Sequence, residues 1–437
     1  MAGPAADLTY VRHEMAPPQA PPRSQVGIVR WLHEKLFSSW LNGILTILCL
    51  YALWWLLQHA LPWFAHGVWN AKSLTECREI IKETWGEGAS GACFAVIRER
   101  WKQFLFGFYP NTMYWRPTLA FVLLLVALAP VLVAELPRRL VWFSLAFPGL
   151  CFWLLWGGSI WVPVLVYAGF LVGYLVHRAV AATGYGLVAP FAAVLAAVVW
   201  WLYLVGPLSG AFASVLPFRL TPVPSKLFGG FMLSVTIGMT GIGFSLPLGI
   251  LLALGRRSDM FIVKSLSIGF IEFIRGVPLI TLLLVASFLL NVFLPPGTNF
   301  DIILRVIIMV TLFASAYMAE TIRGGLAALP RGQYEAADAL GLDYWKSMRL
   351  IIMPQALKIS IPSIVGNFIS LFKDTTLVAI IGLLDPLGLV VSIRADSNWN
   401  GIVWELYGFV ALLFFLCCYG MSQYSRYLER KLRTDHR

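Results

Sequence analysis

The sequence predicts an all-α polytopic membrane protein, and three observations support this prediction. Of the 437 residues, 59% are hydrophobic and only 13% are charged, and the mean hydropathy is +0.76. This composition lies outside the range of soluble globular domains. The hydrophobic residues form long runs, and a helix that crosses a bilayer needs about 20 apolar residues. The basic residues give a net charge of +11, but they lie in short clusters between the runs, which indicates membrane orientation and not nucleic-acid binding.

Ten apolar runs are candidate membrane spans, and we expect helices because backbone polar groups in lipid must bond within their own segment. The runs are residues 40–63, 117–135, 140–157, 160–176, 187–206, 229–254, 277–295, 302–321, 358–382 and 403–424. Residues 1–37 are largely polar and rich in proline, so we expect a disordered cytoplasmic tail there. Residues 428–437 are expected to form a second, short cytoplasmic tail.

Basic residues follow the even-numbered spans, so the positive-inside rule places those ends and both termini in the cytoplasm. These residues are Arg138, Arg139, His177, Arg178, Arg256, Arg257, Lys264 and the basic residues of 323–349 and 426–437. Loop 64–116 then lies outside, although it also carries basic residues. Cys77 and Cys93 both fall in this loop, where an oxidising compartment permits a disulfide, with two unpaired thiols as the alternative.

A polar segment, RGQYEAADALGLDYWKSMRLIIMPQAL at 331–357, lies between spans eight and nine on the cytoplasmic side. Its first part is rich in helix formers, and Gly341 is suited to end that helix in a left-handed conformation. Residues 342–353 predict a second helix that ends near Pro354. The paired alanines of the first helix leave no bulk, so a partner's groove can approach closely. An amphipathic connector that touches only lipid headgroups is the alternative.

Ionisable residues inside a membrane are costly, so they are usually paired or functional. Two acidic residues here precede an arginine by three positions, which suits an ion pair along a helix. The pairs are Glu272 with Arg275 and Glu320 with Arg323. Gly276 and Pro278 are expected to break the helix after the first pair. A hinge that transmits motion and a structural ion pair at the membrane interface both fit this pattern.

Span nine carries polar residues in an otherwise apolar run, and they are candidates for a substrate pathway. They are Asn367, Ser370, Lys373, Asp374, Thr375 and Thr376. An amino-acid zwitterion needs an anionic partner and hydrogen-bond donors, which transporters supply from broken helices near the midplane. Asn367 and Ser370 share a helical face and are expected to lie deeper. Lys373 and Asp374 either contact substrate or neutralise one another or a neighbouring subunit.

Sequence motifs for catalysis are missing from this chain. It has no Walker-type phosphate loop, no nucleophile elbow, no HExxH pair and no metal-ligand spacing. We therefore expect a transport subunit that binds no cofactor, with any ATP and Mg²⁺ held by another chain.

The polar segment resembles a family signature, E-A-A-x(3)-G-x(9)-I-x-L-P, of the inner-membrane permease subunits of bacterial ABC importers. Here it reads Glu335-Ala336-Ala337, Gly341, Ile351 and Met353-Pro354, with Met in place of the usual Leu. FIEFIRGVPLITLL, AYMAETIRGGLAALPRGQYEAADALG and FKDTTLVAIIGLLDPLG resemble motifs of the polar amino-acid permeases. With its five extra N-terminal spans, the whole chain resembles the M-type subunit of general L-amino-acid transporters of Gram-negative bacteria.

The resemblance implies a type I ABC importer fold, with a five-helix core at 228–427 preceded by an N-terminal membrane region at 38–227. It also implies that the elbow docks on an ATPase subunit through Glu335, Ala336, Ala337, Asp338, Gly341 and Pro354. The implied partners are a second, homologous permease subunit, two copies of a cytoplasmic ATPase, a periplasmic amino-acid-binding protein and the lipid bilayer of the bacterial inner membrane. The implied substrate is an L-amino acid.

Two other classes of function remain open from the sequence. A secondary transporter without an ATPase is expected to show paired repeats with broken helices in both halves, and the two halves resemble each other only in hydropathy. A membrane scaffold that recruits a partner is the other alternative, although it gains nothing from the polar residues of span nine.

Overall fold

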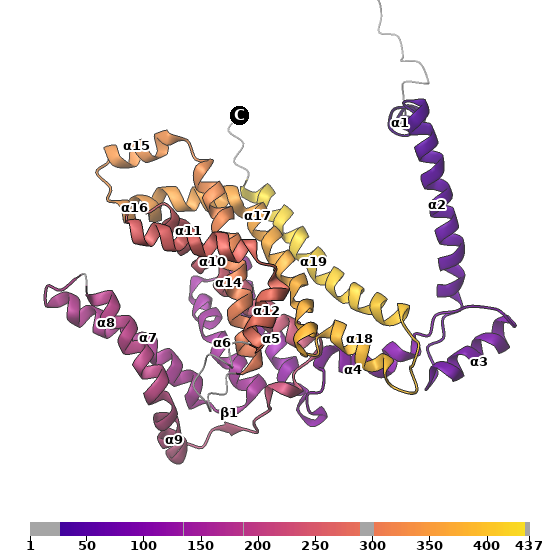
Figure 1. The fold of residues 1–437 in the computed structure, drawn as a ribbon, viewed down its shortest axis with the longest axis horizontal. Coiled ribbons are helices and arrows are strands. Elements are labelled where there is room, and N and C mark those ends of the chain that lie inside the picture. Colours follow the sequence, from indigo (N-terminus) through magenta and orange to yellow (C-terminus); the bar gives the residue numbers. More distant parts are fainter. Residues whose placement is uncertain (1–26, 134, 187, 289–300, 433–437) are drawn as a thin grey trace, which may run out of the picture. The chain divides into compact units, whose positions relative to one another are not determined.

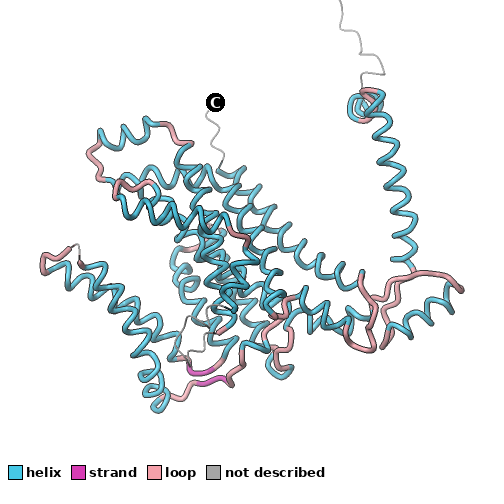
Figure 2. Tube along the Cα trace, viewed as in Figure 1, coloured by secondary structure: helices cyan, strands magenta, loops and turns pink. Residues whose placement is uncertain are grey.

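The computed structural model describes residues 27–133, 135–186, 188–288 and 301–432. Helices dominate these residues, and the strands form one two-stranded ribbon (Figure 2). Among the described residues, nine helices are long and apolar enough to cross a membrane, and one bent helix pair brings the number to ten if it counts as a span. The all-α prediction is therefore confirmed. The parts of the expected tails at 1–26 and 433–437 lie outside the described residues.

The chain divides into two compact units, of which the first comprises residues 1–68 and 78–93. It contains α1 (Gly27–Lys35) and α2 (Trp40–Ala65), and α3 (Leu74–Trp85) ends in it. The prediction of disorder up to residue 37 is wrong for Gly27–Lys35, which form α1. An ion pair between Arg30 and Glu34 at 2.7 Å, four residues apart, favours this helix. Cys77 and Cys93 are both disulfide-bonded, so the alternative of two unpaired thiols does not hold.

The second unit comprises residues 69–77 and 94–437 and begins with the N-terminal helices. They are α4 (Ala95–Phe106), α5 (Trp115–Leu132), α6 (Val141–Trp156), α7 (Trp161–Ala182), α8 (Ala189–Val199) and α9 (Val205–Val215). Strands β1 (Gly158–Ser159) and β2 (Arg219–Leu220) pair antiparallel. The structure thus places helices α3 and α4 inside the long loop at 64–116.

Two of the N-terminal spans are longer than predicted. The fourth reaches Ala182 and the fifth reaches Val215. The fifth passes Pro207 because a π-helical turn at Trp200–Leu204 joins α8 to α9. A proline clashes with the carbonyl four residues earlier in a regular α-helix, and a π turn widens the helix just before that point.

The rest of the second unit forms a helix bundle. Its helices are α10 (Gly230–Arg256), α11 (Phe261–Gly276), α12 (Leu279–Phe288), α14 (Ile302–Ala327), α15 (Arg331–Ala339), α16 (Tyr344–Ser347), α17 (Met353–Asp374), α18 (Pro386–Arg394) and α19 (Trp404–Leu432). Helix α19 extends past the predicted core boundary at residue 427. Helices α15 and α16 lie at one end of the bundle, whereas α18 lies at the other (Figure 1).

Helix α14 is the central element of this bundle, since 50% of its apolar window is buried. It packs closely on α10 because glycines face it: a Cβ on Gly249 would lie 2.7 Å from Cβ of Met318. Small residues at such contacts let helix backbones approach, which is the main source of helix association in membranes.

The N-terminal helices are tied to the end of the bundle that carries α18. Trp156 of α6 donates to Ser225 Oγ at 2.8 Å, and Ser225 in turn donates to Asp301 at 2.5 Å. Asp301 also caps α14, because its Oδ1 accepts from the backbone N–H of Ile303 at 2.9 Å. Leu154 and Leu155 belong to the same buried cluster as residues of α10, α12 and α14.

Gly325 is where α14 crosses α17, and it provides a test of this packing. A Cβ there would lie 2.1 Å from Ser360 Oγ and 2.5 Å from the carbonyl oxygen of Ala356. We expect Gly325→Ala to lower the free energy of unfolding by about 1–3 kcal/mol, because the backbone of α17 must move. Thermal unfolding of the detergent-purified protein measures this. Gly324→Ala is the control: its Cβ would meet nothing within 4 Å, so equal melting temperatures for both variants would contradict the packing argument.

Asp385 is fully buried in the segment between α17 and α19, where it caps α18 by accepting from Gly388 N–H at 2.9 Å. Burial raises the pKa of its carboxyl from 3.8 to about 6. The folded protein therefore holds the carboxyl proton of Asp385 more tightly than the unfolded chain does. The stability that this protonated carboxyl contributes is present below pH 3.8 and is lost as pH rises through about 6. As pH rises from 4 to 7, we expect Asp385→Asn to gain about 2 kcal/mol of stability relative to wild type, because asparagine stays neutral while the buried carboxyl must ionise. Parallel pH profiles of the two melting temperatures would contradict this assignment.

Candidate functional site

The polar segment after α14 forms an elbow of two short helices, α15 and α16. Its turn is a Schellman motif: Gly341 N–H donates to the Asp338 carbonyl at 2.9 Å, and Leu342 N–H donates to the Ala337 carbonyl at 3.2 Å. Gly341 has φ +66°, a left-handed conformation that glycine adopts without steric cost. Asp343 then caps α16 by accepting from Lys346 N–H at 2.9 Å. The predicted helix–glycine–helix geometry is confirmed.

One face of the elbow is fixed to the bundle. Tyr334 donates its hydroxyl to the Leu326 carbonyl at 3.2 Å and accepts from Arg257 Nη1 at 3.0 Å. Gln355 at the start of α17 donates to Gln333 at 3.0 Å. The elbow therefore contacts the adjoining ends of three long helices, α10, α14 and α17. A pocket of about 360 Å³ lies against it, lined by Arg257, Leu326, Ala327, Leu329, Arg331, Tyr334, Glu335 and Asp338.

The opposite face of the elbow is exposed and carries large apolar side chains. Leu340 is 73% exposed and Trp345 is 68% exposed, and Tyr344 beside them is also exposed. The sequence argument did not single out these three residues, although bulky apolar groups inside a polar segment were a signal for them. Exposed apolar groups with charged neighbours are typical of a surface that binds another protein.

The expected contact residues of the elbow divide between its two faces. Glu335, Ala336 and Asp338 are exposed, as a docking role requires. Ala337 is 0% exposed, so the expectation that both alanines admit a partner is wrong for Ala337. It packs inward because Tyr334 and Ala337, three residues apart, share the inner face of α15.

Pro354 does not end the second helix, contrary to prediction. A π-helical turn at Met348–Ile352 leads directly into α17, and Pro354 occupies the first turn of that helix. The missing N–H of proline is tolerated in a first turn, and the π turn relieves the clash with the preceding carbonyl. The elbow is therefore continuous with α17, so a displacement of the elbow acts on that helix directly.

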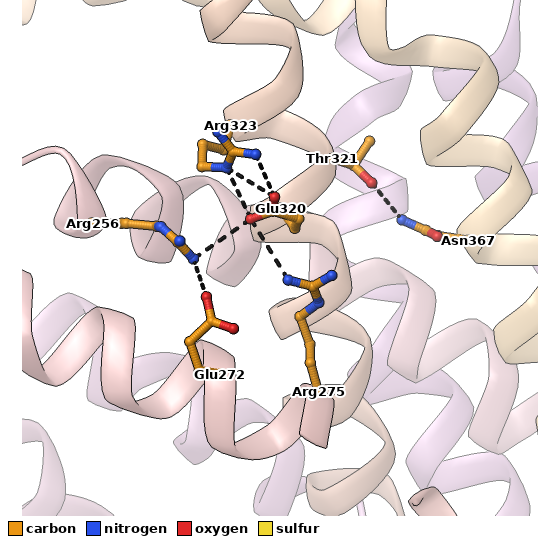
Figure 3. Close-up of polar contacts among 7 residues, drawn as sticks. All are labelled: Arg256, Glu272, Arg275, Glu320, Thr321, Arg323 and Asn367. Carbon is orange, nitrogen blue, oxygen red and sulfur yellow. Dashed lines mark hydrogen bonds and ion pairs between the residues drawn. The ribbon is translucent and has the colours of Figure 1, made fainter. Parts of the chain in front are cut away.

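Five charged residues form a cluster between α10, α11 and α14 (Figure 3). Glu320 of α14 lies at its centre, with its side chain 25% exposed. Arg323 donates to both Glu320 oxygens at 2.5–2.9 Å. Arg256 lies 3.6 Å and Arg275 lies 3.8 Å from Glu320 Oε2. One carboxylate thus joins α10, α11 and α14.

The predicted ion pair between Glu272 and Arg275 is absent among the described contacts, whereas the pair between Glu320 and Arg323 is confirmed. Glu272 instead accepts from Arg256 at 2.7 Å, and Arg275 turns to Glu320. Spacing along one helix predicted the local pair, but carboxylate and guanidinium groups on the neighbouring helices offer partners that the sequence does not place. Arg256 was not among the predicted site residues.

The chain bends sharply next to this cluster. Helices α11 and α12 form an angle of 101° across the residues between Gly276 and Leu279, which confirms the predicted break at Gly276 and Pro278. Proline cannot continue the hydrogen-bond ladder of α11. Helix α12 covers residues 279–288 of the predicted span 277–295, and residues 289–295 lie outside the described residues. Glu320 and Arg275 therefore join the bend to the helix that carries the elbow.

The polar residues of α17 and of the 3₁₀ helix that follows it, Thr375–Ile381, are less concentrated than predicted. Asn367 donates to Thr321 Oγ1 of α14 at 2.8 Å (Figure 3). Thr375 and Thr376 donate to backbone carbonyls three residues earlier, at 2.8 and 2.9 Å. Ser370 and Lys373 are exposed and Asp374 is half-buried. Within the described residues no ion pair joins Lys373 to Asp374. Asn367 is thus bonded to the residue that follows Glu320 in α14.

Similarity to known proteins covers the whole chain. Residues 245–434 match the family described as binding-protein-dependent transport system inner membrane component. A Rhodobacter capsulatus protein, the glutamate/glutamine/aspartate/asparagine transport system permease protein BztC, is 61% identical over 99% of this chain and 100% of its own length. The inner membrane amino-acid ABC transporter permease protein YhdY of Escherichia coli is 39% identical over 96% of both chains. A crystal structure of an amino acid ABC transporter with histidines matches 46% of this chain and 91% of its own, with 28% identity and a TM-score of 0.42.

Proposed function

The chain belongs to the family of binding-protein-dependent transport system inner membrane components, and from this premise we propose that it is the permease subunit of an ATP-driven importer of L-amino acids. Its relatives are transport components, and the chain is a permease subunit and not an enzyme. The relative at 61% identity is described as a transporter of glutamate, glutamine, aspartate and asparagine. These four amino acids are the proposed substrates.

The observation that supports coupling to an ATPase is the construction of the elbow. Its inner face is bonded to α10, α14 and α17, and its outer face presents Leu340 and Trp345 to solvent. A partner that moves the outer face therefore moves helix ends that lead into the membrane. Coupling between distinct sites requires such a connected element with two arrangements.

The proposed assembly has this chain and a second, homologous permease subunit in the bacterial inner membrane, with both termini in the cytoplasm. Two ATPase subunits bind the elbows from the cytoplasm and hold ATP and Mg²⁺, while this chain binds neither. A periplasmic binding protein delivers the amino acid at the opposite side, where loop 64–116 lies. The charged cluster and Asn367 then border the cytoplasmic end of the pathway, and Ser370, Lys373, Asp374, Thr375 and Thr376 remain pathway candidates.

Proteoliposomes test this proposal against the alternatives. They contain the complex purified through a tag on this chain, and uptake of radiolabelled L-glutamine is measured with the periplasmic binding protein outside and ATP inside. ATP-driven uptake that stops with a non-hydrolysable ATP analogue supports an ABC importer. Uptake driven by an ion gradient without ATP would indicate a secondary transporter, and no uptake under any condition would indicate a scaffold.

A further inference from the structure

Ion pairing leaves one guanidinium of the charged cluster without a close carboxylate. Arg323 binds both oxygens of Glu320, and Arg256 has a second carboxylate, Glu272, at 2.7 Å. Among the described residues Arg275 pairs only with Glu320, at 3.8 Å, which is beyond hydrogen-bond distance. Three guanidinium groups and two carboxylates give the cluster an excess of one positive charge, and geometry assigns that excess to Arg275 (Figure 3).

The donors of Arg275 are correspondingly unused. A guanidinium has five N–H donors, and in the described part of the chain none of those of Arg275 has a hydrogen-bond acceptor; its Nε is buried without a partner. The ring of Tyr317 lies 5.6 Å from its Cζ, but this contact engages the face of the group and leaves its N–H donors free. The side chain is 33% exposed, so part of it remains accessible.

Arg275 also lies at a break between two helices, a position typical of ligand sites in transport proteins. It precedes the break between α11 and α12, where the two helices meet at 101°. Broken helices are where membrane transporters expose polar groups to their substrates, and a buried N–H donor without an acceptor is costly, so it calls for an explanation. Arginine suits a carboxylate because its planar donors match the two oxygens.

We propose that Arg275 binds a carboxylate of the transported amino acid at the cytoplasmic end of the pathway. The inference rests on the proposed function and adds to it a residue and a ligand group. The α-carboxylate is common to all four proposed substrates, so one guanidinium serves each of them. Glu320 holds Arg275 only loosely, so a substrate carboxylate meets little competition for it.

Competition binding tests the proposal on the intact complex, purified without the periplasmic binding protein. Radiolabelled L-glutamine is the probe, and L-glutamine and L-glutaminamide, which lacks only the carboxylate charge, are the competitors. We expect wild type to prefer L-glutamine by about tenfold or more, the range for hydrogen bonds to a charged group. In Arg275→Gln the affinity for L-glutamine falls to about that for the amide, so the preference disappears.

If Arg275→Gln fails to assemble, Arg275→Lys replaces it in the test. We expect Arg275→Lys to lose most but not all of the preference for L-glutamine over L-glutaminamide, because lysine keeps the charge without the planar donors of arginine. Arg394→Gln is the matched control, since Arg394 of α18 also has a buried Nε without a partner in the described residues but lies outside the cluster. We expect this variant to keep the wild-type preference for L-glutamine. No saturable binding, no preference in wild type, or an unchanged preference in the Arg275 variants would overturn the proposal. ATP-driven uptake by the same wild-type complex, once it is reconstituted in proteoliposomes with the periplasmic binding protein outside, would show that only this inference, and not the importer function, had failed.

Discussion

Glu320→Gln is expected to lower ATP-driven amino-acid uptake at least tenfold while the complex still assembles. Glu320 is the carboxylate that Arg256, Arg275 and Arg323 share, and a neutral amide leaves three guanidinium groups in one partly buried cluster. Removing one partner of such a group costs about 3–5 kcal/mol in a buried setting, and partial exposure reduces that figure here. Helices α10 and α11 then lose their common link to α14.

Uptake and ATP hydrolysis measured on the same proteoliposomes test this prediction. We expect Glu320→Gln to keep hydrolysing ATP while its uptake is low. The ATPase still binds the elbow, but the motion of the ATPase no longer reaches the bend between α11 and α12. Glu135→Gln is the control, since Glu135 pairs with Lys431 at 2.5 Å on an exposed surface, where solvent screening weakens ion pairs. Uptake by Glu320→Gln within twofold of wild type would show that the cluster is not needed for transport.

Gly341→Trp is expected to abolish uptake by blocking the partner of the elbow. A Cβ at this position meets no atom of this chain within 4 Å, so the indole projects away from the protein and its steric effect falls on whatever binds there. The backbone effect is separate: the φ of +66° costs a non-glycine residue about 1–2 kcal/mol.

Gly341→Ala separates these two effects, because it carries the backbone strain without the bulk. We expect the alanine variant to retain ATPase in copurification and to keep a large part of its uptake, whereas the tryptophan variant loses both. Equal loss of uptake in the two variants would mean that the Schellman turn, and not the surface beside it, is what transport requires.

Local patterns predicted the parts of this structure that depend on short segments. Long apolar runs predicted nearly all the spans, Gly341 predicted the end of α15, and Gly276 with Pro278 predicted the break between α11 and α12. In each case the cause lies in a few adjacent residues: a missing Cβ, a missing N–H or an apolar face.

Two errors, at the Glu272–Arg275 pair and at Ala337, arose where a partner came from elsewhere in the chain, whereas the error at Pro354 has a local cause. Glu272 and Arg275 had the right spacing for an ion pair, yet Arg256 and Glu320 on other helices offered stronger contacts. Pro354 suggested a helix end, but a π turn accommodates it. Ala337 suggested a docking surface, but Tyr334 anchors that face to the bundle. Sequence spacing does not encode these tertiary contacts.

Cross-linking at the elbow tests the central claim most directly. Leu340→Cys, in a chain whose free cysteines Cys49, Cys151, Cys417 and Cys418 are replaced by serine, is treated in membranes with a short thiol cross-linker after single cysteines have been placed in the ATPase. Phe108→Cys, exposed beside α4, is the control. We predict a covalent product with the ATPase from residue 340 and none from residue 108. A failure of residue 340 to cross-link with any ATPase position in a complex that transports would contradict the claim that this elbow receives the motion of the ATPase.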